Sequence, residues 1–511
     1  MKDGKVKDFS IIRLYWAGKM KRSNIFLLAI ILASAILALL RFNSLQIGTS
    51  YDDAKYIILA ESLASGQGYE LVNFPRPQIE RNFPPGWPLM LAPFTLVFPK
   101  NYDALKVVSL ALWLVSIFLL YKLFSKRLGS PYLEILTAFV ALNPFLIGTS
   151  VTTMSESAYL FFSSLALLSF DKTDGKKLGW LILVTVLAFY TQQVRTIGIS
   201  LTISLLVVLL LSRRFREVGV TACLFLIGFL LQSWINLRNG GTVFSSGYEA
   251  QVLSGSVMEK AGQVWANASG YYDQVFAGVL IPIFGTRLDG TFGWLFILLN
   301  VGILLLLALG IFTLQPKLEW MHVYFVVYMA GILAFWNPQV GSVKARFLIP
   351  ILPFVYFYFL SGIKKLAMSN RRIETGLAFA IALLLIARNL QEWRNPVREQ
   401  MTDLSIGANW IAENTPTDAI VMVNEPVPAY VHVKRQTINF PKDGQELQKY
   451  LDNQGIDYII IAPPLQSPRS ADLSVDVKRT AVELGGSPEA YKLVFEDRDN
   501  NVRVYEYTSG E

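Results

Sequence analysis

The sequence is poor in cysteine, histidine and charge, and each shortage excludes a class of protein. One cysteine, Cys223, excludes an internal disulfide framework and a cysteine-based metal cluster. It stands in the apolar run TACLFLIGFLL, where we expect a buried and inert thiol. The two histidines, His322 and His432, are too few and too separated for a histidine-based zinc motif. Only 16% of the residues are charged, against about 25% in an ordinary soluble protein.

The charged residues divide the chain into two parts. Residues 388–511 hold 32 of them, an ordinary soluble density, whereas the first 387 residues hold the other 52. This predicts a membrane domain, residues 1–387, followed by a soluble domain, residues 388–511. The membrane domain has 33 basic and 19 acidic residues, and the soluble domain has 13 basic and 19 acidic ones. Because most of the basic excess lies in short loops between apolar runs, it indicates membrane topology and not a nucleic-acid partner.

Apolar runs bounded by charged residues, proline or glycine predict about eleven transmembrane helices. The expected fold class is therefore an all-α polytopic membrane protein with a small C-terminal α/β domain. The expected spans are 25–41, 106–124, 132–149, 155–170, 178–191, 197–211, 218–235, 292–314, 321–336, 347–361 and 375–388.

Lysine and arginine set the expected orientation of these spans. The basic N-terminal segment predicts a cytoplasmic N-terminus, and the first span has no small-residue cleavage site after it, as in an uncleaved signal anchor. Alternation then places every basic cluster in the cytoplasm and the C-terminal domain outside. Two long external loops result, residues 42–103 and 236–291. The run PLMLAPFTLVF in the first loop is short and broken by proline, so we expect it at the membrane interface and not as a twelfth span.

The C-terminal part has the pattern of a small α/β domain, without a glycine-rich nucleotide fingerprint. Strand-like runs AIVMV, DYIIIA, KLVFE and VRVYEY alternate with the helix-like segments SIGANWIAEN, GQELQKYLDNQ and VDVKRTAVELG. We expect this domain to form or cover part of an external site.

Two adjacent acids after the first span, Asp52 and Asp53, are the strongest candidates for catalytic groups. Paired carboxylates just outside the membrane can supply a general base, because crowding and partial desolvation raise a carboxylate pKa. The same acids also suit the N-terminus of a helix, and both roles can hold at once. An amphipathic helix follows them and ends at Gly66 and Gly68. Its shared face comprises Tyr56, Leu59, Ala60 and Leu63.

The run NFPPGWP, residues 82–88, predicts a rigid turn, because proline fixes φ and donates no backbone hydrogen bond. With the acid pair and the helix ending in LASGQGY, the PPGWPL turn resembles the GT-C fold glycosyltransferases that depend on polyprenyl phosphate. The closer relatives are the protein O-mannosyltransferase and aminoarabinose transferase branch. The resemblance extends to MSESAYLFF (Met154–Phe162), to ARFLIPILPF (Ala345–Phe354) and to NWIAENTP at the head of the C-terminal domain.

This resemblance implies an inverting transfer at the external membrane face. A sugar passes from a polyprenyl phosphate to an acceptor hydroxyl or another nucleophile, and a lipid, a glycan and a protein all remain open as acceptors. In that family the first acid of the pair is the catalytic base, which maps onto Asp52, and Asp53 would support it. Phe83 is a departure, because the aminoarabinose branch usually has a basic residue before the double proline. Arg81 is the nearest substitute.

A phosphate leaving group needs cationic partners, because charge-assisted hydrogen bonds stabilise it strongly. Glu156, at the outer start of a span, is costly unless paired, so we expect it to form a salt bridge with an arginine. Binding of a divalent cation by the carboxylate oxygens of the acid pair remains open, although the sequence identifies no third ligand. The external cations, which could instead extend toward lipid headgroups, are Arg81, Arg195, Lys344 and Arg346.

Two other functions compete with a membrane glycosyltransferase. A transporter or flippase of lipid-linked sugars typically has inverted repeats, broken mid-membrane helices and buried ionisable residues. Here the spans are almost free of charge at mid-depth and the acids cluster at one external edge, which favours chemistry at the surface. The acid pair also disfavours a non-catalytic subunit of a polysaccharide assembly system.

Overall fold

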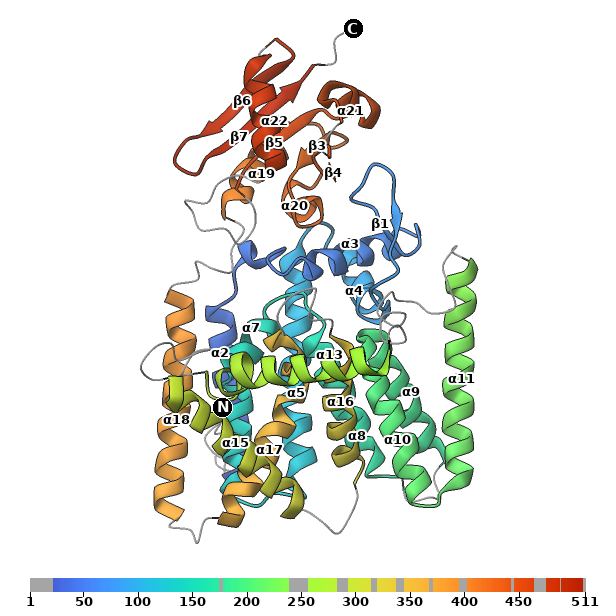
Figure 1. The fold of residues 1–511 in the computed structure, drawn as a ribbon, viewed down its shortest axis with the longest axis vertical. Coiled ribbons are helices and arrows are strands. Elements are labelled where there is room, and N and C mark those ends of the chain that lie inside the picture. The colour runs from blue at the N-terminus through green and yellow to red at the C-terminus, as the bar shows by residue number, and fades with distance from the viewer. Residues whose placement is uncertain are drawn as a thin grey trace, which may run out of the picture.

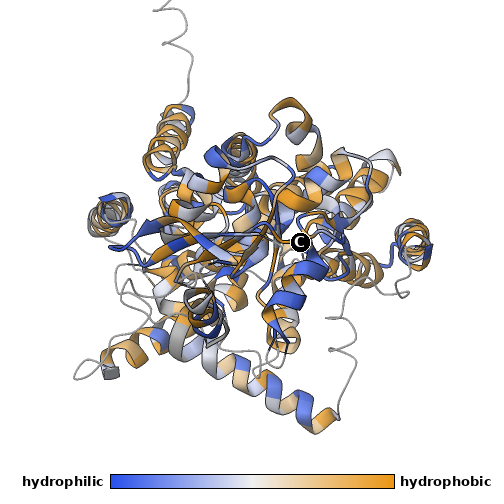
Figure 2. Cartoon of the chain, turned by 90° about the horizontal axis from the view of Figure 1, so that it is seen from above, coloured by the Kyte–Doolittle hydropathy of each residue, from blue (hydrophilic) through white to orange (hydrophobic). Residues whose placement is uncertain are grey.

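In the computed structural model a bundle of helices stands below a five-stranded sheet (Figure 1). Seen from above, the sheet lies over the middle of the bundle, and the helices at the periphery are largely hydrophobic (Figure 2). The basic N-terminal segment, residues 1–21, lies outside the described residues, as do parts of the second long loop. The described residues are 22–173, 178–238, 256–282, 293–313, 319–336, 344–366, 371–394, 402–442, 445–463, 475–487 and 489–508.

Six helices of the described chain are long and apolar enough to cross a membrane. A seventh span results if α6 (Tyr132–Ala141) and α7 (Pro144–Ser150), which meet at 50°, count as one bent span. The break follows from Asn143, whose side chain caps α7, and from proline at the first position of that helix. The six are α2 (Arg22–Leu40), α5 (Tyr102–Ser125), α11 (Phe215–Arg238), α15 (Gly293–Thr313), α17 (Leu352–Leu366, with the 3₁₀ turns before it) and α18 (Arg371–Arg394).

The other predicted spans are helices of 13 to 17 residues, shorter than the ~20 residues that a perpendicular span needs. Every predicted apolar segment is thus helical, and length and composition support six or seven spans in a multi-pass membrane protein. The short helices pack against neighbouring helices within the bundle. They are α8 (Glu156–Phe170), α9 (Leu178–Val194), α10 (Ile199–Leu211) and α16 (Trp320–Phe335).

One prediction about the bundle is wrong. Cys223 lies exposed on α11, because this helix stands at the edge of the bundle and packs against α9 and α10 on one side only. Thr221 and Ser233 are its buried residues. An apolar run can therefore be exposed to lipid as readily as it can be buried in protein.

Loops predicted to share one side of the membrane meet at the end of the bundle away from the sheet. Arg127, after α5, forms ion pairs with Asp171, after α8, at 3.0 Å and with Glu319, which caps α16. Arg214, before α11, lines the same cavity as these three residues. Paired charges thereby join the ends of α5, α8 and α16, and Arg214, after α10, donates to the Thr173 carbonyl at 3.4 Å.

The second long loop contains structure that the sequence did not predict. Its helix α13 (Val257–Gly270) lies lengthwise in both views, so it runs across the bundle (Figure 1, Figure 2). Asn267 and Gln263 donate to the carbonyl of Trp336 at the C-terminus of α16, at 2.7 and 2.6 Å. A π-helical turn, Tyr271–Val275, and α14 (Phe276–Leu280) continue the chain.

The C-terminal part is the α/β domain that the sequence predicted, with the strand order β4-β3-β5-β7-β6. Alternation sends Val421 and Val423 to a core under α19 and α20, and Met422 to a core under α21 and α22. Helix α20 and strand β4 were not predicted. The strands are β3 (Ile420–Val423), β4 (Gln436–Ile438), β5 (Tyr458–Ile461), β6 (Tyr491–Asp497) and β7 (Val502–Tyr507). The helices are α19 (Thr402–Asn414), α20 (Pro426–Val433), α21 (Leu447–Gln454) and α22 (Val475–Gly486).

Between the bundle and the sheet, α3 (Asp52–Ala64) lies across the upper end of the bundle (Figure 1). A helix at the predicted place and its glycine end are confirmed, since Gly66 and Gly68 both have positive φ. The predicted single apolar face is not, because Ile57 and Ile58 are buried outside it and Leu63 is only partly buried. A two-stranded hairpin of β1 (Glu70–Leu71) and β2 (Gln78–Ile79) follows. The PPGWPL run then begins α4 (Gly86–Val97), whose 12 residues are too few for a twelfth span.

Two glycines allow α15 and α17 to touch backbone to backbone. A Cβ on Gly310 would lie 1.9 Å from the Tyr358 carbonyl oxygen, and one on Gly362 would lie 2.0 Å from the Leu306 carbonyl oxygen. Small residues at such seams let membrane helices approach closely. The seam holds α17, the helix that follows Arg346, against α15.

We expect Gly310→Ala to destabilise the protein by about 1–3 kcal/mol, because the added methyl group forces the two helices apart. Gly302→Ala on the same helix is the matched control, since no atom lies within 4 Å of its Cβ position. It should be neutral or gain up to about 1 kcal/mol from helix propensity. Thermal unfolding in detergent compares the two, and equal melting temperatures would contradict the tight seam.

Candidate active site

The two acids occupy the first turn of α3 and have different environments. Tyr51 is the helix N-cap residue, so neither acid takes the cap position. The Asp53 side chain is fully buried, whereas the Asp52 side chain is 20% exposed. Only Asp52 is therefore accessible to a substrate.

Asp53 is held by the turn that precedes the helix. Its Oδ2 accepts a hydrogen bond of 2.8 Å from the Gly48 N–H, and Thr153 Oγ1 donates to its main-chain carbonyl at 3.2 Å. Burial raises the pKa of the Asp53 carboxyl to about 6, with the neighbouring charge of Asp52 adding to the shift and the Gly48 hydrogen bond opposing it. Asp53 thus serves the structure of the turn.

Asp52 faces a cation from a distant part of the chain. Its Oδ2 lies 2.6 Å from Nη2 of Arg346, and the Arg346 side chain is 35% exposed. Arg346 stands in the 3₁₀ turn Ala345–Phe347 that leads into α17. The acid pair and the ARFLIPILPF run, which are far apart in the sequence, therefore meet in one place.

Glu156 forms the predicted salt bridge, and its partner is Arg195. The Glu156 side chain is fully buried at the start of α8, and Arg195 follows α9. Arg195 Nη1 also donates to Ser155 Oγ at 3.3 Å, and Ser155 Oγ lies 3.3 Å from the hydroxyl of Tyr56 on α3. This buried network ties the start of α8 to the helix that carries the acids.

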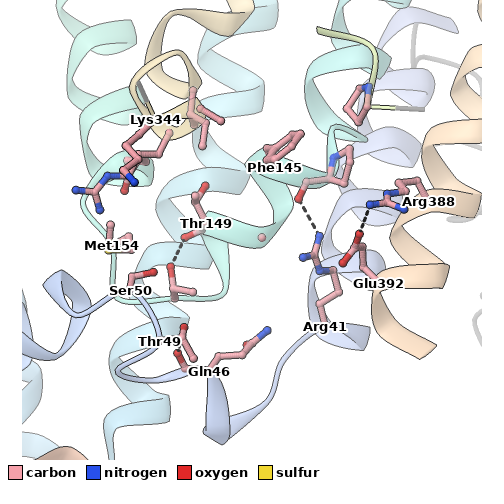
Figure 3. A pocket seen from close by; sticks show the side chains of 18 of the residues that line it. Arg41, Gln46, Thr49, Ser50, Phe145, Thr149, Met154, Lys344, Arg388 and Glu392 are labelled. Atoms are coloured by element: carbon pink, nitrogen blue, oxygen red, sulfur yellow. Dashed lines mark hydrogen bonds and ion pairs between the residues drawn. The ribbon is translucent and has the colours of Figure 1, made fainter. Parts of the chain in front are cut away.

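A cavity of about 580 Å³ opens beside Arg346 and Glu156. Figure 3 shows Lys344 at one side of it and Arg41 and Arg388 at the other. Arg41 donates a 2.8 Å hydrogen bond to the Pro144 carbonyl, and Arg388 pairs with Glu392 at 2.7 Å. Four basic residues line the cavity against two acidic ones, so it is suited to an anionic group. Its remaining lining is polar or apolar, including Gln46, Thr49, Ser50, Phe145, Thr149, Thr152, Met154 and Ile349.

Arg41 and Arg388 were not predicted as site residues. Arg41 follows the first span and Arg388 lies in the last one, so each fits the ordinary pattern of a basic residue near a span end. Of the predicted cations, Lys344 and Arg346 line the cavity. Arg195 is not a lining residue, but it forms an ion pair with Glu156, which is one. Arg81 lies exposed after β2 and is not among the lining residues.

Lys55 brings a cation to the double-proline turn. Its Nζ lies 2.9 Å from Glu80 Oε2 and 4.8 Å from the ring centre of Phe83. The lysine comes from α3, one helical turn after Asp52. A basic group, Lys55, thus stands beside Phe83.

The PPGWPL turn has a structural role. The Trp87 side chain is buried and its Nε1 donates to the Thr153 carbonyl at 2.7 Å. A Cβ on Gly86 would lie 2.6 Å from the backbone of Gln193. The turn therefore packs α4 against the segment before α8 and against the end of α9, close to the Glu156–Arg195 pair.

A divalent cation does not fit the described residues. The carboxylate of Asp52 faces a guanidinium group, and that of Asp53 is enclosed by the turn. Among the described residues no group of three or more histidine, cysteine, aspartate or glutamate side chains could hold a metal ion. The chemistry derived below therefore uses no metal.

Breaking the Glu156–Arg195 pair should be costly. Glu156→Gln leaves the Arg195 charge buried without its partner, and we expect a loss of about 3 kcal/mol in the free energy of unfolding. The double variant Glu156→Gln/Arg195→Gln should lose less than the sum of the single variants, because no charge is left uncompensated. Unfolding in detergent measures all three variants, and strictly additive losses would show that the pair is not coupled.

Asp53 should make stability depend on pH. The pKa of the Asp53 carboxyl is raised in the folded protein to about 6. Its contribution to the free energy of unfolding is therefore fully present at low pH and is lost as pH rises from about 4 to about 6. Asp53→Asn removes this cost while its side-chain oxygen can still accept from Gly48. Relative to wild type, the variant should gain about 2–3 kcal/mol between about pH 4 and about pH 7.5. Melting temperatures at both pH values test this, and a difference independent of pH would contradict it.

Comparison with known proteins shows the fold. No protein-family model and no curated protein matches the sequence. The chain superimposes on ArnT from Cupriavidus metallidurans bound to undecaprenyl phosphate, with a TM-score of 0.59 and 11% identity over 95% of this chain and 98% of that one. Archaeal oligosaccharyltransferase AglB from Archaeoglobus fulgidus, in complex with an inhibitory peptide and a dolichol-phosphate, gives a TM-score of 0.53 at 11% identity over 86% and 69%. Another structure of the Archaeoglobus fulgidus oligosaccharyltransferase, in complex with zinc and sulfate, gives 0.53 at 13% identity over 85% and 67%. The resemblance to GT-C fold glycosyltransferases is thus confirmed at the level of the fold.

Proposed function

We propose that this protein is an integral-membrane inverting glycosyltransferase. It moves a sugar from a polyprenyl-phosphate donor to an acceptor at the external membrane face, where the acceptor is a lipid, a glycan or a protein of the cell envelope. The N-terminus is then cytoplasmic and the C-terminal domain extracytoplasmic. The observation that carries the proposal is the contact between Asp52 and Arg346 beside a cavity rich in cations.

Asp52 acts as the general base. Its carboxylate is partly exposed, so it can accept a proton from an acceptor hydroxyl held within hydrogen-bond reach. The hydroxyl oxygen then attacks the anomeric carbon of the sugar from the face opposite the phosphate. The bond from the anomeric carbon to the phosphate oxygen breaks, and its electron pair leaves with the lipid phosphate. A single displacement of this kind inverts the anomeric configuration.

The cations of the cavity stabilise the leaving phosphate. Arg346 contacts Asp52 and lines the cavity, and Lys344 lies two residues before it. Guanidinium groups bind phosphate oxygens through charge-assisted hydrogen bonds, which strengthen as negative charge develops on the leaving group. Arg41 lines the cavity as well and presents a further positive charge to the donor. The Glu156–Arg195 pair and Asp53 hold this arrangement and do not react.

The fold supports the same class of reaction. The neighbours include a transferase bound to undecaprenyl phosphate and an oligosaccharyltransferase bound to a dolichol-phosphate. We propose a lipid phosphate of this class as the donor carrier and the cavity as the site of its phosphate. The accessible acid at the edge of the cavity favours an enzyme over a flippase, because moving a lipid across the membrane requires no base.

Sugar transfer by purified protein from a panel of polyprenyl-phosphate sugars tests the proposal. Asp52→Asn should lower transfer or slow donor hydrolysis by at least about a hundredfold, because it removes the base. Donor binding should remain intact, because the asparagine oxygen can still accept a hydrogen bond from Arg346. Arg346→Ala should weaken donor binding by about ten- to a hundredfold, because it removes a charge-assisted hydrogen bond. Arg81→Ala is the matched arginine control and should retain activity and binding.

Two results would overturn the proposal. Full transfer by Asp52→Asn would show that Asp52 is not the general base. Wild-type protein that binds the donor and moves it between leaflets of a vesicle, but never cleaves it, would identify a flippase.

A further inference from the structure

One peptide group before α3 is hydrogen-bonded on both of its sides. The carbonyl oxygen of Ile47 lies 2.7 Å from Nε2 of His432, which belongs to α20 in the C-terminal domain. The N–H of Gly48, in the same peptide unit, donates to Asp53 at 2.8 Å. Because a carbonyl oxygen can only accept, Nε2 of His432 carries the proton. The two bonds run in series from the C-terminal domain to the acid pair.

The C-terminal domain also packs against the turn at Gly48. This glycine has φ +93°, which residues with a side chain rarely adopt, and a Cβ added to it would lie 3.2 Å from Cβ of Pro428. A peptide plane is rigid, so bonds to its carbonyl and to its N–H together fix its orientation. The hydrogen bonds and the contact leave the 47–48 peptide no room to rotate.

This peptide sets the direction of Asp52. The turn continues with a 3.0 Å hydrogen bond from the Tyr51 N–H to the Gly48 carbonyl, and Tyr51 itself has φ +59°. Asp52 follows directly and points at Arg346. A base must be held within a fraction of an ångström of its productive position, and a shift of about 1 Å can cost about a hundredfold in rate. Rotation of the 47–48 peptide would release Asp53 and move the start of the helix.

A separate contact holds the C-terminal domain on α3. The hydroxyl of Tyr430 donates to Glu61 at 3.0 Å and accepts from Lys100 at 2.7 Å, near the far end of the helix. Asn73 and Thr437 join the same two parts of the chain beyond it, with the Thr437 N–H donating to the Asn73 carbonyl at 2.7 Å. Docking of the domain therefore does not depend on His432 alone.

From this geometry we infer that His432 is a positioning residue for the proposed transfer. It holds the 47–48 peptide, which holds Asp53, and thereby keeps Asp52 directed at Arg346 and the cavity. The inference rests on the proposed role of Asp52 as the base. It assigns to the C-terminal domain a direct part in setting the reaction geometry.

Three variants separate positioning from docking. His432→Phe fills the space of the ring without a donor, and kcat should fall about tenfold, which corresponds to about 1.4 kcal/mol. The KM for the lipid donor should change less than about twofold, because the cavity is untouched. His432→Gln restores a side-chain N–H and should recover most of kcat. Tyr430→Phe, the matched control, removes both hydrogen bonds of the Tyr430 hydroxyl, which belong to the docking contact only, and should keep wild-type kcat.

Hydrogen–deuterium exchange of residues 47–53 gives a readout independent of activity. It should speed up at least about fivefold in His432→Phe and remain unchanged in His432→Gln and Tyr430→Phe, because a broken hydrogen bond opens the turn locally. If His432→Phe does not fold, His432→Leu makes the same test with a smaller side chain. Unchanged exchange together with unchanged kcat, while Asp52→Asn is inactive, would overturn this inference alone. Absence of transfer in wild type would overturn the proposed function, and exchange would still decide the role of His432.

Discussion

The ion pair between Asp52 and Arg346 is the interaction on which the site depends. It joins the start of α3 to the segment before α17, and these segments are far apart in the sequence. Each partner is fixed from behind. The buried Asp53 carboxylate holds the turn under Asp52, and the glycine seam between α15 and α17 holds the helix that follows Arg346. A short contact between two flexible side chains persists because both backbones are held in place.

Neighbouring acids take different parts because their surroundings differ. The Asp53 side chain is buried and hydrogen-bonded to the turn. Burial raises the pKa of its carboxyl, because ionising a buried group costs free energy. Asp52 faces a guanidinium group and remains partly open. From the sequence, the pair can serve either the structure of the helix start or catalysis. We propose the catalytic role for Asp52 and the structural role for Asp53.

Features with a local pattern could be predicted from the sequence. Apolar periodicity located every helix of the bundle that was expected, alternation located four strands of the sheet, and the cost of a buried charge predicted a partner for Glu156. The exposed thiol of Cys223 and the cavity cations Arg41 and Arg388 could not be predicted, because they depend on which helices become neighbours. A basic residue near a span end has the same sequence signal whether it faces lipid headgroups or a cavity. The lengths of the short helices could not be predicted either, because hydropathy does not show which helices will pack around a segment.

The hydrogen bond from His432 to Ile47 closes a loop of 385 residues. The turn that carries the acids is synthesised before α20, which supports it from 385 residues further along the chain. Contacts of such long separation form late in folding, because chain entropy must be lost before they are gained. A nascent chain can therefore insert its spans and hold the acid pair for some time while the turn is still incomplete. Under the proposed function, the chain reaches its full rate of transfer only after the C-terminal domain has folded back onto α3.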